Sequence, residues 1–156
     1  MTNLSGTRNL PTENSANLRI ARLSRRIYEA ALSRIYGGLA GEGFPEIRPA
    51  HSVIFRHIDP QGTRPSDLAQ RAGITKQSVA YLIDGLERDG FVETVPDPND
   101  GRARLVRLTD RGRAAHAALI RLSEQLDADL AGALPDGRRI EQLREDLAAI
   151  VRRLEV

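Results

Sequence analysis

The sequence predicts a mainly α-helical fold that carries one small β-hairpin. Most apolar residues recur at spacings of three and four, which is the period of an amphipathic helix. One segment near position 100 instead alternates apolar and polar residues on both sides of a cluster of turn-forming residues. Aromatic residues make up only 4% of the chain and tryptophan is absent, so Leu, Ile, Val and Ala must form the core. Such a composition favours helix packing over a β-sandwich.

Two helices are expected in the first third of the chain. Residues 1–17 are polar and contain Gly, Pro, Asn and Ser, which predicts a mobile tail. A helix is predicted over about 18–39, and the segment 41–45 ends it. A shorter helix follows over about 49–58, closed by the turn residues 59–62.

The next two helices are separated by a short turn that contains glycine. Pro65 suits the first position of a helix over 65–72, and Gly73 ends this helix. Ile74 is expected to fill the gap beneath the turn. Thr75 is a good N-cap for a helix over 76–89. The buried stripe of this last helix is predicted to be Val79, Leu82, Ile83 and Leu86.

A β-hairpin and two more helices complete the predicted elements. Strands are expected over 91–95 and 104–108, with the turn cluster between them. A long helix begins at Thr109-Asp110, and residues 134–137 break it. The last helix has an apolar seam spaced three, four, three, four, formed by Ile140, Leu143, Leu147, Ile150 and Leu154. This seam needs an apolar partner, because burial is worth about 25 cal/mol per Å² of apolar surface.

Total charge alone says little about partners. The chain has 23 basic and 21 acidic residues, for a net charge of +2, so the placement of the charges must decide whether it binds nucleic acid. The absence of cysteine excludes disulfides, thiolate metal sites and thiol redox sensing. No signal-peptide core or membrane-spanning stretch is found, so we expect a cytoplasmic protein that is not associated with a membrane.

Helix, glycine turn, helix and hairpin is the order of a winged helix-turn-helix. The first half of the second helix, 75–81, contains no acid, whereas its second half carries Asp84, Glu87 and Asp89. A recognition helix inserts its N-terminal end into the major groove, where Lys76 would meet phosphate and Gln77 and Ser78 would reach base edges. In an isolated helix, the same layout would indicate only a solvated polar face.

The hairpin tip favours the DNA-binding interpretation. It offers Arg102 and Arg104 beside the flexible residues Asn99 and Gly101, and a narrow minor groove attracts arginine. The alternative is an exposed turn with incidental arginines. A helix-turn-helix and a basic tip together predict DNA binding more strongly than either feature alone.

Four motifs stand out in this region: Ser66-Asp67-Leu68-Ala69, Leu86-Glu87-Arg88-Asp89-Gly90-Phe91-Val92, Asp97-Pro98-Asn99-Asp100-Gly101-Arg102 and Leu108-Thr109-Asp110-Arg111-Gly112. Together they resemble the MarR family of bacterial regulators. The resemblance covers about 18–154 and is strongest in 65–113. The resemblance implies that Arg102 enters the minor groove and that Asp100 orients a wing or neighbouring arginine through an ion pair. It also implies that Thr75 to Tyr81 lie in the major groove.

The resemblance further implies a homodimer on double-stranded DNA, reading a pseudo-palindromic operator and acting more commonly as a repressor. The expected division is a tail at 1–17, an N-terminal dimerisation helix and linker at 18–48, a winged helix-turn-helix DNA-binding domain at 49–109, and C-terminal dimerisation helices at 110–156. A protein-interaction module and a non-specific architectural DNA binder stay open as alternatives.

Many similar proteins bind small aromatic or phenolic ligands where the dimer helices meet the winged module. The candidate effector residues here are Tyr28, Tyr36, His51 and Phe55, and Arg48 or Arg56 could meet an anionic ligand. His51 and Phe55 are four residues apart and are expected to share a helix face. The simpler alternative is that Phe55 belongs to the core, that the tyrosines pack at an interface and that His51 is an ordinary surface or interfacial histidine.

No catalytic constellation is found, so we do not expect an enzyme. The sequence has no Gly-x-Ser-x-Gly, no His-Glu-x-x-His and no phosphate-binding loop. The three histidines, His51, His57 and His116, are too dispersed in the sequence to indicate a zinc site, and no cofactor is expected.

Overall fold

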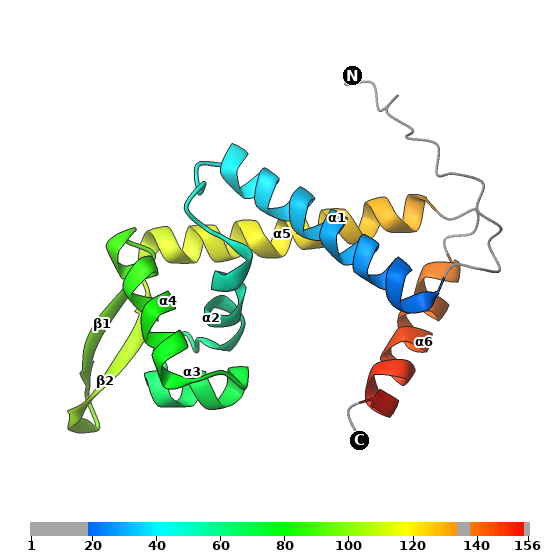
Figure 1. The fold of residues 1–156 in the computed structure, drawn as a ribbon. Helices are drawn as coiled ribbons and strands as arrows, with labels where there is room; N and C mark the ends of the chain where they lie inside the picture. Colours follow the sequence, from blue (N-terminus) through cyan, green and yellow to red (C-terminus); the bar gives the residue numbers. More distant parts are fainter. Residues whose placement is uncertain (1–18, 134–137, 155–156) are drawn as a thin grey trace.

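The computed structural model describes residues 19–133 and 138–154 (Figure 1). The helices of this part are α1 (Ile20–Gly41), the 3₁₀ turn η2 (Pro49–His51), α2 (Ser52–His57), α3 (Pro65–Ala72), α4 (Lys76–Arg88), α5 (Asp110–Gly132) and α6 (Arg138–Leu154), and its strands are β1 (Val92–Asp97) and β2 (Asp100–Leu108). The long helices α1 and α5 pack against each other. Helices α2 to α4 and the hairpin lie at the N-terminal end of α5, and α6 follows its C-terminal end.

The two helices on either side of the glycine turn are confirmed. Helix α3 spans 65–72, with Pro65 in its first turn, and Gly73 ends it in the left-handed conformation (φ 65°), which glycine adopts without steric cost. Thr75 caps α4, because its hydroxyl oxygen accepts a hydrogen bond from the backbone N–H of Ser78 at 3.1 Å. The helix predicted over 49–58 begins instead as the 3₁₀ turn η2, which is common at helix starts.

The hairpin strands are longer than predicted. The antiparallel register pairs Val92 with Leu108 and continues to Pro96 opposite Arg104, with an irregularity between Pro96 and Asp97. Residues of the predicted turn cluster therefore form the ends of the two strands. Pro96 lies at the irregularity, and proline is tolerated at a strand edge or bulge. On its other side, β2 is paired with buried Thr63, whose N–H and C=O bond Val106 at 2.9 and 3.0 Å.

The core lies where α1, η2 to α4, the hairpin and the first half of α5 meet. Its fully buried large side chains are Leu39, Ile54, Leu68, Val79, Leu86, Phe91, Val92 and Val106. The predicted stripe of α4 is confirmed for Val79, Ile83 and Leu86, and Leu82 is partly buried against the core. The expectation for Ile74 is wrong: it is 36% exposed, since Leu68 and Val79 already occupy the core between α3 and α4.

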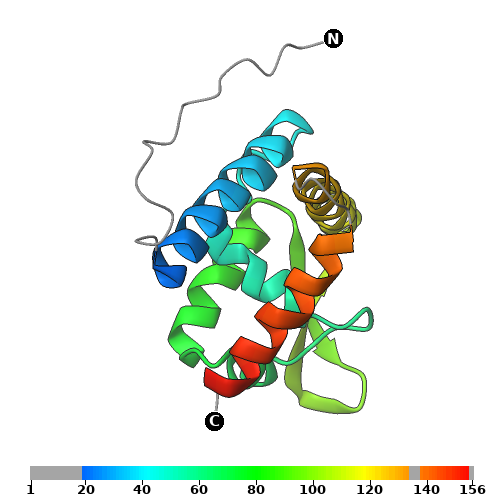
Figure 2. The same cartoon turned by 90° about the vertical axis from the view of Figure 1, so that its right-hand side faces the viewer.

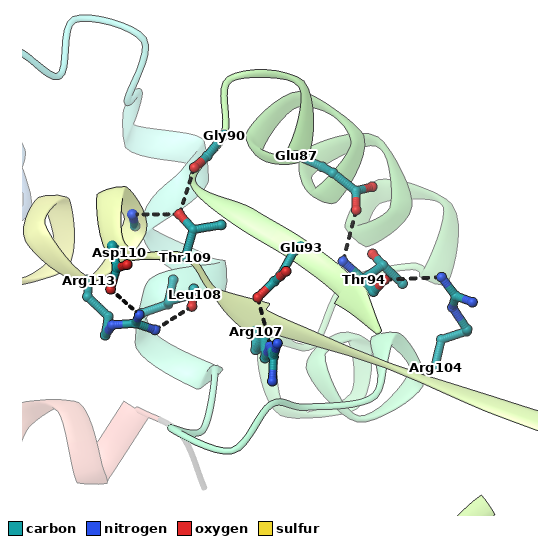
Figure 3. Close-up of polar contacts among 11 residues, drawn as sticks. Glu87, Gly90, Glu93, Thr94, Arg104, Arg107, Leu108, Thr109, Asp110 and Arg113 are labelled. Carbon is teal, nitrogen blue, oxygen red and sulfur yellow. Dashed lines mark hydrogen bonds and ion pairs between the residues drawn. The ribbon is translucent and has the colours of Figure 1, made fainter. Parts of the chain in front are cut away.

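Helix α5 starts in close contact with the end of α4 and the start of β1 (Figure 3). The Thr109 hydroxyl donates a hydrogen bond to the carbonyl oxygen of Gly90 at 2.6 Å and accepts one from the N–H of Gly112 at 3.0 Å. The N–H of Thr109 also donates to the carbonyl oxygen of Phe91 at 3.1 Å. The predicted helix start is thus confirmed, and it is tied to the hairpin.

Helix α6 presents an apolar stripe that the described residues leave largely open. Its members are each between 41% and 80% exposed and comprise Leu143, Leu147, Ile150, Val151 and Leu154. Figure 2 views the molecule from the side on which α6 lies nearest the viewer. The predicted break at 134–137 and the predicted tail at 1–17 lie outside the described residues. Within the described ranges, no helix has the length and apolarity that a bilayer span requires.

Candidate nucleic-acid interface

The first two turns of α4 stand out from the molecule on one side. Thr75, Lys76, Gln77 and Ser78 are exposed, and Tyr81 is 78% exposed, whereas Val79 between them is fully buried. The Thr75 and Ser78 hydroxyl oxygens lie 2.8 Å apart and share a hydrogen bond. The Thr75 hydroxyl oxygen also accepts from the backbone N–H of Ser78 at the helix start. Among the described residues, Lys76, Gln77 and Tyr81 have no side-chain hydrogen-bond partner, and they are available to another molecule.

The hairpin tip carries a second set of polar groups. Arg102 is exposed and its guanidinium bonds none of the described residues. Arg104 is partly committed to the hairpin, because its Nη2 donates to the carbonyl oxygen of Thr94 at 3.0 Å (Figure 3). Asp100 accepts a hydrogen bond from the backbone N–H of Arg102 at 3.2 Å, so it shapes the turn on which Arg102 sits.

An ion pair that the sequence analysis missed connects this tip with α3. The Arg64 guanidinium donates to one carboxylate oxygen of Asp97 from Nε at 3.0 Å and from Nη2 at 2.6 Å. Its Nη2 also lies 3.4 Å from a carboxylate oxygen of Asp100. Arg64 can thus be the neighbouring arginine of the ion pair that the resemblance implies for Asp100. The Asn99 N–H and the Arg64 guanidinium lower the pKa of Asp97, because both stabilise the carboxylate. No local spacing could signal a pair 33 residues apart.

The start of α4 and the hairpin tip face the same side of the molecule. In Figures 1 and 2 the tip is at the lower end of the molecule, and α4 runs upward from the α3–α4 turn towards the start of β1. Lys76 is the first residue of α4 and Arg102 follows the turn at the start of β2, and both residues are exposed. The acidic residues Asp84 and Glu87 lie further along α4, away from this end.

Comparison with known proteins agrees with this arrangement. A model of the MarR family matches residues 47–103. The transcriptional repressor YetL of Bacillus subtilis is 42% identical over 75 residues, which are 48% of this chain and 45% of YetL. The matched segment, which includes η2, α2 to α4 and the hairpin tip, is similar to the MarR family. The aligned segment spans less than half of YetL, and the family match is centred on the helix-turn-helix and the hairpin.

Solved structures share the fold of this chain. FabT of Streptococcus pneumoniae, in complex with DNA, has a TM-score of 0.75 at 22% identity, covering 88% of this chain and 96% of FabT. CouR of Rhodococcus jostii RHA1, bound to p-coumaroyl-CoA, has a TM-score of 0.63 at 22% identity, covering 84% of this chain and 90% of CouR. These neighbours establish a winged-helix fold, with a mainly helical chain and a two-stranded hairpin.

The start of α5 contains a second long-range link, formed by Arg111. Arg111 donates to the carbonyl oxygen of Asp89 at 2.7 Å and to both carboxylate oxygens of Glu46 at 3.0 Å. Its guanidinium carbon lies 4.4 Å from the centre of the Phe91 ring, a cation–π distance. Arg111 therefore joins α5 to the α1–η2 connection and to the α4–β1 turn.

Three of the four candidate effector residues line one cavity between α1, α2 and α5. This cavity of about 420 Å³ contains Tyr28, Tyr36 and Phe55, together with Arg56 and His116. Phe55 is also a core residue, with its ring centre 5.8 Å from that of His116. Burial raises the pKa of Tyr36, so its hydroxyl stays protonated at neutral pH.

His51 lies elsewhere, in a crevice of about 640 Å³ between η2 and α4 that also holds Arg48, Tyr81 and Arg88. The expected shared face with Phe55 is absent because His51 belongs to the 3₁₀ turn, where its Nδ1 accepts a hydrogen bond from the Arg48 N–H at 3.2 Å. Burial lowers the pKa of His51. Within 19–133 and 138–154, no three His, Asp or Glu side chains are close enough together to hold a metal ion.

Proposed function

We propose that this chain is a transcription regulator that binds double-stranded DNA with α4 and the hairpin tip. The observation that carries the proposal is that two exposed cations, Lys76 at the start of α4 and Arg102 at the hairpin tip, belong to elements that reach the same end of the molecule (Figure 1). The backbone N–H groups at the start of α4 and Lys76 would meet phosphates, and Gln77, Ser78 and Tyr81 would face base edges in the major groove. Arg102 would enter the adjacent minor groove, with Arg104 and Asp100 beside it.

The matched proteins support this reading. FabT was crystallised with DNA, and YetL is a transcriptional repressor. In this chain, the proposed DNA-binding domain is 49–109, and repression is the expected mode of action. A protein that acts on the chromosome works in the cytoplasm of a bacterial cell, which is therefore its expected location.

The functional unit is proposed to be a homodimer formed by 18–48 and 110–156. The apolar stripe of α6 is exposed in one protomer, and a groove of about 310 Å³ between α1 and α5 is lined mainly by apolar side chains, among them Leu23, Ile27, Leu126 and Leu130. A second copy that covers such surfaces would gain hydrophobic stabilisation. Two-fold symmetry would place two copies of α4 about one helical turn of DNA apart, on a pseudo-palindromic operator.

Release by a small aromatic ligand completes the proposal. The cavity at Tyr28, Tyr36 and Phe55 is bounded by α1 and α5, the proposed dimer helices, and by α2 of the winged module. A ligand there would contact both parts and so bias the separation of the two DNA-reading heads. CouR, which shares the fold, was crystallised with p-coumaroyl-CoA.

A titration on two DNA duplexes tests the proposal. One duplex comes from the region upstream of the gene for this chain, and the other is its scrambled counterpart, each measured at two salt concentrations. Preference for the natural duplex, with affinity that falls as salt rises, is the expected result. Equal affinity for both duplexes would favour a non-specific architectural binder, and no binding to any upstream duplex would favour a protein-interaction module.

A further inference from the structure

Arg64 connects the start of α3 to the hairpin tip at two levels. Through the backbone, its neighbour Thr63 is bonded in both directions to Val106, two residues before the end of β2. Through the side chain, its guanidinium binds Asp97 with two donors and reaches Asp100 with one of them. The residue that precedes α3 is therefore held against the hairpin near its base and near its tip.

The two carboxylates that bind Arg64 also shape the turn. Asp97 is only 7% exposed, and its second oxygen accepts a hydrogen bond from the N–H of Asn99 at 2.9 Å. The second oxygen of Asp100 accepts one from the N–H of Arg102 at 3.2 Å. One contiguous set of contacts thus runs from Arg64 through these carboxylates to the backbone of Arg102.

We propose that Arg64 is a positioning residue that fixes where Arg102 stands relative to α4, an inference that rests on the proposed DNA binding. A two-stranded hairpin is marginally stable by itself, so its tip needs a tether to keep one orientation. Helix α3 supplies the anchor for this tether, because it packs directly on α4. Holding Arg102 at a set distance from Lys76 pre-organises the two groups for adjacent grooves, which lowers the entropic cost of binding.

Arg64 also neutralises two acidic groups near the proposed DNA surface, and this effect must be separated from positioning. Arg64→Lys keeps the positive charge, but it replaces a planar fork of donors by a single ammonium group. An effect of this variant therefore reports on geometry. Arg71→Lys is the matched control, because Arg71 lies in α3, which Arg64 precedes, and binds a carboxylate, Asp59, together with the carbonyl oxygen of His57.

The first measurement needs no DNA. The chain contains no cysteine, so single cysteines at the exposed positions Ala80 on α4 and Gly101 at the tip can carry two spin labels. We expect a narrow distribution of label distances in the otherwise unchanged protein and with Arg71→Lys, and a broadened or shifted one with Arg64→Lys. An unchanged distribution with Arg64→Lys would overturn the positioning role, whatever the protein does with DNA.

The second measurement compares the operator affinity of the wild type, Arg64→Lys, Arg102→Ala and the double variant. Arg64→Lys is expected to raise Kd by roughly 3- to 30-fold in the wild-type background and to have almost no effect when Arg102 is already absent, as for residues in one network. Equal weakening in both backgrounds would mean a general structural role and would overturn the proposal. If Arg64→Lys broadens the label distances but the wild-type protein shows no operator preference, the proposed DNA binding is refuted and the positioning role of Arg64 still holds.

Arg64→Lys could also act by loosening the fold as a whole. Thermal unfolding of each variant is therefore recorded, and affinities are compared only well below the melting temperature. Asp97→Asn weakens the Arg64–Asp97 contact by changing the carboxylate instead of the arginine. Its effect on operator affinity is expected to depend on Arg102 in the same way. Disagreement between the two variants, with both folded, would count against the tether.

Discussion

The Cα of Gly112 in α5 lies directly against the carbonyl oxygen of Phe91. A Cβ placed on Gly112 would come within 1.9 Å of that oxygen, far inside van der Waals contact. The same carbonyl accepts a hydrogen bond from Thr109, so it cannot move without loss of the link between the hairpin and α5. Glycine is required here by the close approach of two backbones.

Gly112→Ala is therefore expected to destabilise the protein, although alanine is the better helix former. We expect a loss of about 3 kcal/mol in the free energy of unfolding, at the upper end for overpacking. Gly37→Ala in α1 is the control, because among the described residues no atom outside the adjoining helix backbone and chain neighbours lies within 4 Å of the added methyl group. Urea denaturation should show the control unchanged or up to about 1 kcal/mol more stable, and equal effects of both substitutions would contradict this view of the α5 start.

Arg111→Ala is expected to loosen the junction of α5 with the α4–β1 turn. The substitution removes a hydrogen bond to a backbone carbonyl, a cation–π contact and the pairing with Glu46. The free energy of unfolding should fall by about 1–2 kcal/mol. Arg25→Ala removes an arginine from an exposed pair within one helix and should cost much less stability than Arg111→Ala. A comparable loss for both variants would show that Arg111 is only a surface residue.

The stability of the protein should depend on Asp97 in acid. The pKa of Asp97 is lowered in the folded chain, by the N–H of Asn99 and by Arg64, so the folded state binds its proton less readily than the unfolded state. The stabilisation by Asp97 is complete above the pKa that Asp97 has in the unfolded chain. It is lost as the pH falls through the lower pKa that Asp97 has in the folded chain. Asp97→Asn should thus be less stable than wild type at pH 7, and the gap should close progressively below about pH 5. A gap that stays constant down to pH 2 would rule out the ionised Asp97 as its source.

Two substitutions on the proposed DNA surface should differ in kind. Arg102→Ala should weaken binding to all duplexes alike and reduce the salt dependence, because its contact is mainly electrostatic. Gln77→Ala should change which base is preferred at one position, at a cost of about 1–3 kcal/mol if Gln77 reads an adenine edge. Binding to a panel of single-base operator variants separates them; a uniform loss for Gln77→Ala would remove it from the base-reading set.

The apolar stripe of α6 should control the oligomeric state. Leu147→Glu places a charge in the stripe and is expected to shift sedimentation from dimer to monomer and to weaken operator binding. Ala149→Glu carries the same charge on the opposite face of α6, two residues further along, and should leave the dimer intact. A wild-type protein that sediments as a monomer at micromolar concentration would remove the basis for the proposed two-fold operator.

Local patterns in the sequence determined most elements of this fold. Pro65, Gly73 and Thr75 act through their own backbone and side-chain chemistry, so the bounds of the two helices could be predicted to within one residue. The exposed, acid-free start of α4 follows from the same local period, because burying Val79, Ile83 and Leu86 leaves Lys76 and Gln77 in solvent. The family motifs likewise lie within one continuous segment.

Only the tertiary structure decided which distant groups meet. Arg64 reaches Asp97 across 33 positions and Arg111 reaches Glu46 across 65, and no periodicity encodes such pairs. His51 and Phe55 do not share a helix face, because a 3₁₀ turn replaces the first turn of the expected helix and changes the direction of the His51 side chain. Sequence determines local geometry because neighbours along the chain always interact, whereas long-range pairing depends on how the whole core packs.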